Sequence, residues 1–484
     1  MSAPIVRFQH IRFSYQLEPI LDDFSWFWPH GQHIAILGGN GAGKTTLAKL
    51  ITDTLRPNSG EVEYADDIGP KDIAHISFDL HRELMEHDRR YDDSETRDDA
   101  FDVGTTVKQA VLQGYTPDAA FTELCTRLGI DHILEQGIRY ISTGESRKTL
   151  LARALFAKPA ALILDNPFEG LDIHAQAEMH TLLAELVSST TPLILLTKDA
   201  NDIPDTIDTV YQMDHGKIRG ECSALEAKKH AKVIHHFAKP LPIANAPSYP
   251  ADKALLELRN INVNFRGKQV LSDINWTLMP HQHCCISGPN GAGKSTLLGL
   301  LCGENDKAYG QQVFLFGRQR GSGESIWEVK SQFGILNTSM QMSNLKRTKA
   351  IDVVASGLFD SVGLYNNYSE SQRQTLMAWL DALDLLPLKE QRFERLSFGE
   401  QRMILLARAM VKSPRILILD EPCIGLDNDQ KAKLLGAVDQ IAAHGQTRIL
   451  FVSHRREELP ACINQFIDLV PSENGGYTAN IRES

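Results

Sequence analysis

The chain has 484 residues, of which 42% are hydrophobic and 23% charged, and its formal net charge is -11 at pH 7. This length exceeds one ordinary core and suits two or more domains, and the composition excludes a disordered protein. The acidic balance argues against a broad, non-specific grip on nucleic acid, although it leaves room for local basic patches. The run KSPRILILD does not interleave aromatic with basic residues, so we expect no direct nucleic-acid partner.

The amino-terminal residues MSAPIVRFQHIRFSYQ lack the apolar core of a signal peptide, and no apolar run approaches the roughly 20 residues of a membrane span. Seven cysteines without a CxxC pair are typical of idle thiols in a reducing compartment. We therefore expect a cytoplasmic protein that reaches the inner face of a membrane only through a partner such as a permease.

The two halves of the chain carry the same motifs in the same order. In chain order, the first half predicts strands at 5–15 and 33–37, the loop GGNGAGKTT at 38–46, a helical stretch over 81–140, ISTGES at 141–146, LILDNP at 162–167 and a strand at 193–196. The second half repeats the motifs as GPNGAGKST at 288–296, LSFGEQ at 396–401 and LILDEP at 417–422. Ser142 precedes Asp165, and Ser397 precedes Asp420, by the same 23 residues, so the chain is a tandem duplication.

A proline-rich segment separates the halves. Residues 223–238 have the pattern of a short helix, and KPLPIANAPSYPADK follows them with four prolines. Repeated prolines among small residues are typical of a stiff, extended linker. We therefore expect a first domain at 1–238, a linker at 239–254 and a second domain at 255–484.

The pattern within each half predicts an α/β fold. Short apolar runs such as 161–164, 416–419 and 448–453 suit buried parallel strands, and helix-like segments separate them. We expect two tandem P-loop NTPase domains. Each should carry an antiparallel β layer, formed by the strands before its P-loop, and a helical subdomain at 81–140 or 340–395.

Both glycine-rich loops match the pattern G-x-x-x-x-G-K-[ST]. Each follows a strand and opens a helix, so backbone N–H groups and a helix amino terminus converge on the phosphates of a nucleotide. Lys44 and Lys294 should meet the β- and γ-phosphates of ATP, and Thr45 and Ser295 should meet Mg²⁺. The nucleotide-binding residues predicted from the loops are Gly38, Gly39, Asn40, Gly41, Ala42, Gly43, Lys44, Thr45 and Thr46, and Gly288, Pro289, Asn290, Gly291, Ala292, Gly293, Lys294, Ser295 and Thr296.

These motifs, in this order and twice over, resemble ABC ATPases across almost the whole chain. The resemblance implies a head-to-tail pairing, in which the P-loop of one cassette faces the S-x-G-[EQ] signature of the other. More narrowly, FGRQRGSGESIWEVK, ISTGESRKTLLARAL and the chain length resemble bacterial tandem-cassette ATPases assigned to molybdate transport and also to photorepair. The segment 317–330 itself is expected to be a loop that caps a helix at Ser325–Glu328.

One composite site has the full set of residues that the resemblance implies for hydrolysis. Asp420 ends an apolar strand and would orient Mg²⁺ through water, and Glu421 would act as general base on the attacking water. His454 resembles the switch histidine that contacts the γ-phosphate, and Asp427 resembles the residue that crosses the seam between cassettes. The other residues of this site are Lys294 and Ser295, with Ser142, Gly144 and Glu145 from the first half.

The other site departs from that pattern at two positions. Asn166 stands where the second half has Glu421, and an amide cannot take a proton from water. Lys198 stands where the second half has His454, and a lysine pairs with phosphate only as a mobile point charge. Because loss of a positioned general base costs about 10²–10⁴-fold in rate, we expect this degenerate site to hold ATP and hydrolyse it slowly. Its other residues are Lys44, Thr45 and Asp165, the last holding Mg²⁺ through water, with Ser397, Gly399 and Glu400 from the second half.

Two aromatic residues match the position from which a ring stacks on adenine in this family. Tyr15 precedes Lys44, and Phe265 precedes Lys294, by the same 29 residues. Both rings could instead be core residues of their strands. The shared spacing favours stacking on the nucleotide.

The glutamine that family members usually carry between the ATPase core and the helical subdomain is missing twice. Asp79 or Leu80 takes its place in the first half, and Thr338 takes it in the second, where Gln341 is out of register. Because the resemblance gives that glutamine a role in linking nucleotide state to a transport partner, its absence argues against ordinary transporter coupling.

We predict an ATPase that energises or regulates a transport system, of the molybdate type by the resemblance, with permease subunits as partners. Two alternatives stay open: a non-transport ATPase that acts on ribosomes or DNA, and a regulatory clamp that uses ATP. Tandem cassettes of the translation type usually have a long charged helical linker, so the short proline linker counts against that version.

Overall fold

The computed structural model describes residues 4–15, 18–77, 104–207, 209–229, 237, 239–242, 249–265, 267–303, 308, 310–337, 345, 347–361, 363, 367–453, 455–473 and 475–483. The chain divides into two compact units, Met1–Val233 and Ile234–Ser484. Residues 243–248 of the expected linker lie outside the described ranges. The finer division at 1–238, 239–254 and 255–484 stays a prediction.

The first unit alternates strands and helices, with η marking short 3-10 helices. Of the helix expected at 223–238, α7 (Ala224–Lys229) covers the first turns, and 230–236 and 238 lie outside the described residues. The elements are β1 (Val6–Tyr15), β2 (Glu18–Trp28), β3 (Ile34–Leu37), α1 (Lys44–Ile51), β4 (Ser59–Tyr64), η1 (Pro70–Asp72), β5 (Ile73–Ile76), α3 (Val107–Leu112), α4 (Ala119–Leu128), η2 (Asp131–Ile133), η3 (Ile138–Tyr140), α5 (Thr143–Phe156), β6 (Ala161–Asp165), α6 (Ile173–Val187), β7 (Leu193–Thr197), η4 (Ala200–Asp202), β8 (Thr209–Asp214), β9 (Lys217–Cys222) and α7 (Ala224–Lys229).

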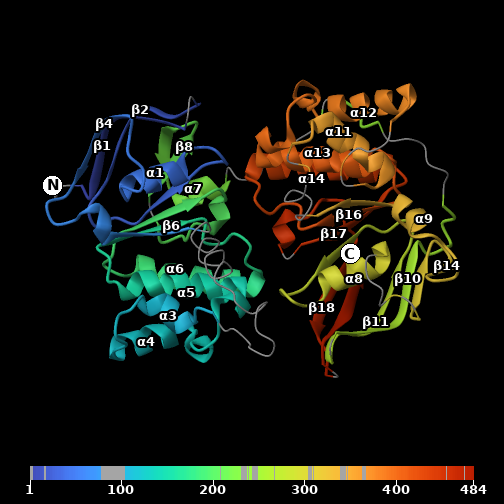
Figure 1. Ribbon diagram of the computed structural model, residues 1–484, viewed down its shortest axis with the longest axis horizontal. Helices are drawn as coiled ribbons and strands as arrows, with labels where there is room; N and C mark the ends of the chain where they lie inside the picture. Colours follow the sequence, from blue (N-terminus) through green and yellow to red (C-terminus); the bar gives the residue numbers. More distant parts are fainter. Residues whose placement is uncertain are drawn as a thin grey trace. The chain divides into compact units, whose positions relative to one another are not determined.

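The central sheet of the first unit has the strand order β5-β6-β7-β3-β8-β9, in which only β8 and β9 are antiparallel neighbours. A separate antiparallel layer has the order β2-β1-β4. Figure 1 shows α3, α4, α5 and α6 on one side of β6, and α1 with the antiparallel layer on the other.

The apolar runs of β6 and β7 fit this sandwich because every residue in them is buried. Successive side chains of a strand point to opposite faces. Leu162 and Leu164 accordingly join the core under the helical subdomain, whereas Ala161 and Ile163 join the core under α1 and the antiparallel layer. Two hydrophobic cores therefore hold the sheet of this unit from its two faces.

In the parts that the structure describes, the second unit largely repeats the element order of the first. Its elements are β10 (Leu256–Phe265), β11 (Lys268–Leu278), β12 (Cys284–Ser287), α8 (Lys294–Cys302), β13 (Gln312–Leu315), β14 (Arg318–Gln319), α9 (Ile326–Ser331), β15 (Phe333–Leu336), α11 (Ala350–Ser356), η6 (Gly357–Phe359), α12 (Glu370–Ala382), η7 (Leu386–Leu388), η8 (Phe393–Arg395), α13 (Phe398–Met410), β16 (Ile416–Asp420), α14 (Asn428–His444), β17 (Arg448–Val452), η9 (Arg456–Glu458), β18 (Gln465–Pro471) and β19 (Tyr477–Glu483). It has β14 and α9 between β13 and β15, where the first unit has η1 between β4 and β5.

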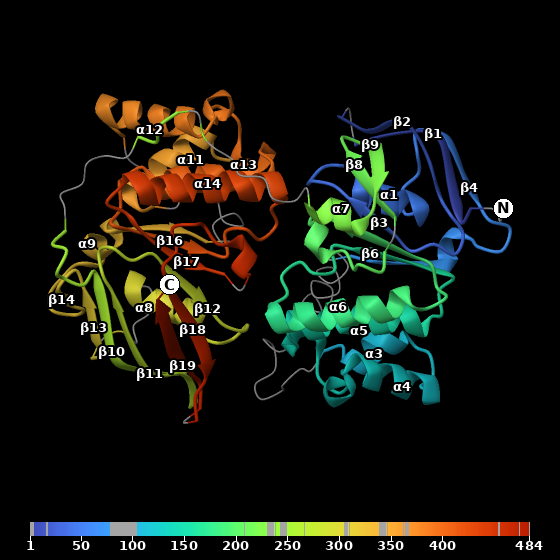
Figure 2. The ribbon, with the colours of Figure 1, turned by 180° about the vertical axis from the view of Figure 1, so that it is seen from behind.

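The strand order β15-β16-β17-β12-β18-β19 of the second unit repeats that of the first. Here β19 also pairs with β11 at Tyr477 and Leu271, which joins the antiparallel strands to the central sheet as one ten-stranded sheet. Figure 2 shows α11, α12, α13 and α14 on one side of β16 and β17. The predicted α/β fold, with an antiparallel β layer and a helical subdomain in each half, is therefore confirmed.

The segment 317–330 contains the helix cap that was predicted at Ser325, and also the short strand β14, where only a loop was expected. Ser325 caps α9, its Oγ accepts the N–H of Glu328 (3.1 Å), and the carboxylate of Glu328 accepts the N–H of Ser325 (2.8 Å). Before the cap, Arg320 and Glu324 form a buried ion pair at 2.7 Å. This loop therefore folds through its own polar contacts.

No helix among the described residues is long and apolar enough to cross a membrane. The described ranges include all seven cysteines, and none of these forms a disulfide.

Candidate active sites

The two P-loops have the same local structure. Gly43 and Gly293 precede α1 and α8 with φ angles of 102° and 89°, a left-handed conformation that glycine adopts without the steric cost of a Cβ. Lys44 and Lys294 then begin the helices, are 6% and 8% exposed, and bind carbonyl oxygens of their own loops. The hydrogen bonds run from Lys44 Nζ to Gly38 (2.6 Å) and Gly39 (2.9 Å), and from Lys294 Nζ to Gly288 (2.7 Å) and Pro289 (3.1 Å).

Parallel pairing brings the polar residues of each unit to one edge of its sheet. In the first unit β3 and β6 both pair with β7, and their last residues lie level with its carboxyl end. The P-loop after β3, Asn166 after β6 and Lys198 after β7 therefore meet at the edge where ligands bind to open α/β sheets. In the second unit β12, β16 and β17 do the same for its P-loop and Glu421.

In the first unit both oxygens of the Asp165 carboxylate are held by neighbouring donors. Thr45 Oγ1 donates to Oδ2 (2.6 Å), and Asn166 Nδ2 donates to Oδ1 (2.7 Å). His75, on β5, has its Nε2 3.9 Å from the same Oδ2. Sequence reasoning missed His75, although a lone polar residue in the otherwise apolar run IAHI was an available signal. The Asn166 amide thus acts as a donor to Asp165.

In the second unit a cavity of about 640 Å³ lies at the equivalent edge. Burial raises the pKa of Asp420, the adjacent charge of Glu421 raises it further, and the charge of Lys294 opposes both. Carboxylate and hydroxyl oxygens are the ligands that Mg²⁺ prefers, and a cation would relieve the repulsion between the two acids, so these residues fit a Mg²⁺ ion. The lining residues are Val270, Asn290, Gly291, Gly293, Lys294, Ser295, Thr296, Asn337, Asp420 and Glu421.

The residues after β6 and β16 have the same backbone and different side chains. Asn166 and Glu421 have φ angles of 48° and 49°, and their N–H groups donate to the carbonyls of Leu196 (2.9 Å) and Val452 (3.0 Å). Asparagine visits this left-handed region readily, whereas glutamate adopts it at a steric cost. The two sites therefore differ here in chemistry and not in backbone course.

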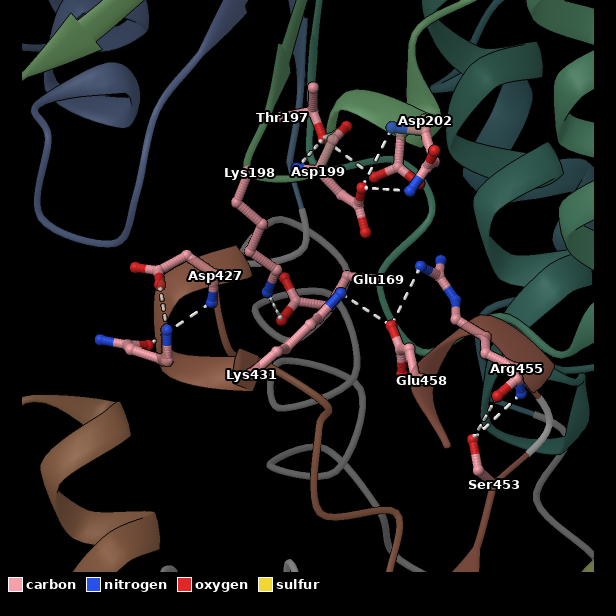
Figure 3. Close-up of polar contacts among 12 residues, drawn as sticks. Glu169, Thr197, Lys198, Asp199, Asp202, Asp427, Lys431, Ser453, Arg455 and Glu458 are labelled. Atoms are coloured by element: carbon pink, nitrogen blue, oxygen red, sulfur yellow. Dashed lines mark hydrogen bonds and ion pairs between the residues drawn. The ribbon is translucent and has the colours of Figure 1, made fainter. Parts of the chain in front are cut away.

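Lys198 is held by an ion pair within its own unit (Figure 3). Its Nζ lies 3.0 Å from Oε1 of Glu169, and the two side chains are 13% and 27% exposed. The turn beneath it is fixed, because Thr197 Oγ1 donates to Asp202 Oδ2 (2.9 Å). The partner Glu169 was not predicted from the motifs, and it gives the point charge expected at Lys198 a defined counter-ion.

His454, predicted at the equivalent position of the second unit, lies outside the described residues. Beside it, the Arg455 N–H donates to Ser453 Oγ (3.0 Å), and Glu458 pairs with Lys431 (2.7 Å) and with Arg455 (3.4 Å), as drawn in Figure 3. The segment that follows β17 is therefore held to α14 by an ion pair. In the first unit, the ion pair of Lys198 instead joins the segment after β7 to the loop after β6.

The signature serines cap their helices identically. Oγ of Ser142 or Ser397 accepts the N–H of Glu145 or Glu400 (3.3 Å in both), and each glutamate carboxylate accepts the serine N–H (2.7 Å in both). A hydroxyl can donate as well as accept, so each serine keeps the capacity to donate its O–H proton to a phosphate when one is bound. Glu145 and Glu400, predicted to bind nucleotide, act in this structure as the carboxylates of capping boxes.

Each signature helix also carries a buried arginine that sequence reasoning missed. Arg147 and Arg402 follow their signature serines by the same interval and are 3% and 0% exposed. Burial lowers the pKa of each guanidinium to about 10, against the charge of Glu169 in the first unit and those of Asp420 and Glu421 in the second. Arg147 Nη2 also donates to the carbonyl of Glu169 (3.2 Å). The repeated interval was the signal for these residues.

The signature packs against the following loop more tightly in the second unit. The Arg402 guanidinium lies 5.3 Å from the centre of the Phe398 ring, and a Cβ added to Gly425 would lie 2.3 Å from that ring. In the first unit a Cβ on Gly170 would find Thr143 Cγ2 no closer than 3.9 Å. The ring of Phe398 therefore needs the glycine beside it.

Tyr15 and Phe265 end β1 and β10 and are 46% and 41% exposed. This exposure argues against a core role for either ring and leaves both accessible to a base. Gly144 and Gly399 lie in the first turns of α5 and α13, and Asp427 caps α14 by accepting the N–H of Gln430 (2.9 Å).

The residues at the missing glutamine positions, Asp79, Leu80, Thr338 and Gln341, lie outside the described ranges. Within each unit the structure gathers the P-loop and the acidic strand end. The pairing of each signature with the P-loop of the other unit stays a prediction, as do the roles of Glu421 and the two aromatic rings.

Comparisons with known proteins agree with this architecture. The family profile described as ABC transporter matches residues 21–169 and 271–424. A protein named ABC transporter ATP-binding protein ModF, from Escherichia coli strain K12, is 34% identical over 454 residues, which cover 91% of this chain and 92% of that protein. The uncharacterized ABC transporter ATP-binding protein C323.04 of Schizosaccharomyces pombe is 27% identical over 482 residues, covering 96% and 97%.

Solved structures, including the following two, also match nearly the full chain. An archaeal ribosome recycling factor, in complex with a ribosomal stalk protein, has a TM-score of 0.60 at 16% identity and covers 97% of this chain and 89% of its own. A structure titled RNase-L Inhibitor has a TM-score of 0.59 at 15% identity, covering 97% and 90%. At these identities the likeness concerns the fold.

Proposed function

Because the chain belongs to the ABC transporter family and is an ATPase of that type, we propose that it hydrolyses ATP at one of two unequal sites and only holds ATP at the other. One observation carries the proposal. After the same backbone turn, the second unit presents the carboxylate of Glu421, whereas the first presents the amide of Asn166.

At the second P-loop the chain supplies a phosphate ligand and a base. Lys294 would exchange its bonds to loop carbonyls for bonds to the β- and γ-phosphates. Glu421 would take a proton from the water that attacks the γ-phosphorus, and ADP would leave with the bridging oxygen. A bound Mg²⁺ ion would neutralise charge on the phosphates, held by Ser295 and, through water, by Asp420.

At the first P-loop the binding groups are equivalent but the base is missing. Lys44 binds carbonyls of its own loop as Lys294 does, Thr45 follows it in the sequence as Ser295 follows Lys294, and Asp165 is the acid that would orient Mg²⁺. The Asn166 amide donates to that acid and has no lone pair basic enough to accept a proton from water. ATP would therefore stay bound at this site for longer than at the second site, because its hydrolysis would be slower.

The cassettes are proposed to complete one another. Ser142 and Gly144 would donate to the γ-phosphate at the second P-loop, and Ser397 and Gly399 would do so at the first, because helix amino termini favour phosphate. Tyr15 and Phe265, whose rings are exposed at strand ends, would stack on the adenines.

Retained nucleotide tests the inequality of the sites. After incubation with ATP-Mg and rapid gel filtration, the chain should retain ATP through its first site. Lys44→Ala should lose the retained ATP, whereas Lys294→Ala should keep it and lose turnover. Retention that depends on Lys294, or retained ADP alone, would contradict the proposal.

We propose that this ATPase energises or regulates a transport system as a cytoplasmic protein that attaches to the inner membrane through permease subunits. The name of the Escherichia coli relative and the resemblance of 317–330 support this role, and the molybdate substrate rests on that resemblance alone. The missing glutamines favour a second candidate, an ATPase acting on ribosomes or DNA.

Capture of the partner distinguishes these candidates. Glu421→Gln with ATP-Mg should trap the closed state, and Glu421→Gln with ADP is its matched control. Transport predicts ATP-dependent sedimentation with membranes and recovery of permease subunits. Sedimentation with ribosomes would support the second candidate, and sedimentation with neither would support a regulatory clamp.

A further inference from the structure

We propose that Glu169 and the γ-phosphate of ATP compete for the ammonium of Lys198, so that the first site recognises ATP by exchanging one anion for another. The inference deepens the proposed function and rests on it, because it requires ATP at the first P-loop. It assigns to Glu169 the role of a positioning residue that sets the preference of this site for ATP over ADP.

The ion pair lies where the γ-phosphate is expected. Lys198 follows β7 at the sheet edge that also carries the P-loop and Asp165, and it occupies the position of the switch residue. Its Nζ is 3.0 Å from Oε1 of Glu169 (Figure 3). An ammonium on a flexible four-carbon stem can turn from this carboxylate to a phosphate oxygen without movement of the backbone.

Partial burial gives the exchange its energetic weight. The side chains of Lys198 and Glu169 are 13% and 27% exposed, so the pair is screened less than a surface ion pair. A pair of opposite charges presents little net attraction to a phosphate. The γ-phosphate of ATP must therefore replace Glu169 as the anion that pairs with Lys198. ADP lacks the γ-phosphate, so its binding leaves the ion pair in place.

The backbone of Glu169 links the pair to two other parts of the first unit. Its N–H donates to the carbonyl of Asn166 (3.2 Å), and its carbonyl accepts from Arg147 Nη2 (3.2 Å). Arg147 lies on α5, the helix that Ser142 caps. A change of anion at Lys198 is thereby connected, through the backbone of Glu169, to the turn at Asn166 and to the helix α5.

The second unit does not repeat the pair. Ile424 stands at the position of Glu169, and His454 stands at that of Lys198. The pairs drawn there in Figure 3 instead join Glu458 to Lys431 and Arg455, within the segment after β17 and α14. Competition for a lysine is therefore proposed for the first site alone.

Nucleotide affinities test the competition directly. The full chain carries Lys294→Ala, so that binding reports the first site, and ATP-Mg or ADP-Mg displaces a fluorescent ADP analogue. Glu169→Gln should raise the affinity for ATP about three- to tenfold, the range between a surface pair and a buried charged hydrogen bond. The affinity for ADP should change less than about twofold. Glu178→Gln, which removes a carboxylate paired with Lys148 in the same unit, should change neither.

The Lys198→Met background separates competition from simple repulsion. With competition, Glu169→Gln raises ATP affinity more when Lys198 is present, because the lysine is released to the phosphate. With repulsion alone, the gain is larger in the Lys198→Met background, where the paired lysine no longer offsets the charge of Glu169. Glu169→Ile, the residue of the second cassette, serves as a second variant if Glu169→Gln fails to fold.

A larger gain in the Lys198→Met background, or equal gains for ATP and ADP, would overturn the inference. If the Lys294→Ala parent chain shows no nucleotide binding that depends on Lys44, the proposed function would be overturned instead. The two failures are therefore distinguishable in the same titrations.

Discussion

The turns that follow β6 and β16 share a backbone and differ in chemistry. Both residues lie in the left-handed region with φ near 48° and 49°, and both N–H groups bind the neighbouring strand. Asn166 suits this conformation, whereas Glu421 holds it at a cost of about 1 kcal/mol. The same backbone conformation is thus strained at Glu421, where a carboxylate would act as base, and unstrained at Asn166, where the base is absent.

Substitution of the acids that end β6 and β16, Asp165 and Asp420, should show that the two sites contribute unequally to hydrolysis. Asp420→Asn should lower the steady-state ATPase rate by about 10- to 100-fold, because it removes a charged ligand of Mg²⁺ beside the general base. Asp165→Asn should keep the ATPase rate within about threefold of the parent rate. It should weaken the retention of ATP, because it removes a charged ligand of Mg²⁺ at the site that holds ATP. ATPase assays across a Mg²⁺ titration measure both effects. Equal losses of rate in the two variants would contradict unequal sites.

The loops after the two strands should differ in their tolerance of a Cβ. Gly425→Ala should cost about 2–3 kcal/mol, because the methyl group meets the Phe398 ring and the φ of +84° is unfavourable for alanine. Gly170→Ala should cost only about 1 kcal/mol, since φ is +74° but the space is open. Urea unfolding midpoints measure the difference, and Gly425→Ala in a Phe398→Ala background is the control. A similar cost at both glycines would mean that the ring does not constrain the loop.

The strain at Glu421 should be visible in stability. Glu421→Asn should raise the free energy of unfolding by about 1 kcal/mol, and Asn166→Glu should lower it by about the same amount. Glu421→Gln is the matched control, since it removes the charge and keeps the long side chain. Calorimetric unfolding of each full-length variant measures the shifts, and a destabilised Glu421→Asn chain would contradict strain at this position.

The smallest expected effect is a pH dependence confined to the second site. Burial and then Glu421 raise the pKa of Asp420 above its ordinary 3.8, so the folded chain binds this proton more tightly than the unfolded chain. That contribution to stability is present at low pH and is lost as pH rises through the raised pKa. Glu421→Gln removes the repulsive charge and should raise the melting temperature by about 1–3 °C at pH 7, with less gain at pH 4. A gain that grows toward pH 4 would exclude repulsion between the acids.

Residues repeated in both halves were predictable, and residues present in one half were not. The P-loops, Asp165, Asp420 and their strands could be predicted because each motif recurs at the same spacing. Glu169 could not, because its partner Lys198 is 29 residues away and the other half offers Ile424 at that position.

The fold shows the same limit. The alternating and apolar strands of each half were predictable, and so was the capped helix α9. The pairing of Leu271 with Tyr477 was not, because a single pair of residues far apart in the chain joins the two layers of the second unit. Arg147 and Arg402 lay between these cases: their equal spacing was visible, but their burial became evident only from the packing of α5 and α13.

Steady-state ATP hydrolysis by Glu421→Gln and Asn166→Ala, measured side by side in the full-length chain, tests unequal chemistry most directly. The account predicts that Glu421→Gln loses about 10²–10⁴-fold in rate, as removal of a general base does, and that Asn166→Ala stays close to the parent rate. Comparable losses in the two variants, or an unimpaired Glu421→Gln chain, would contradict it.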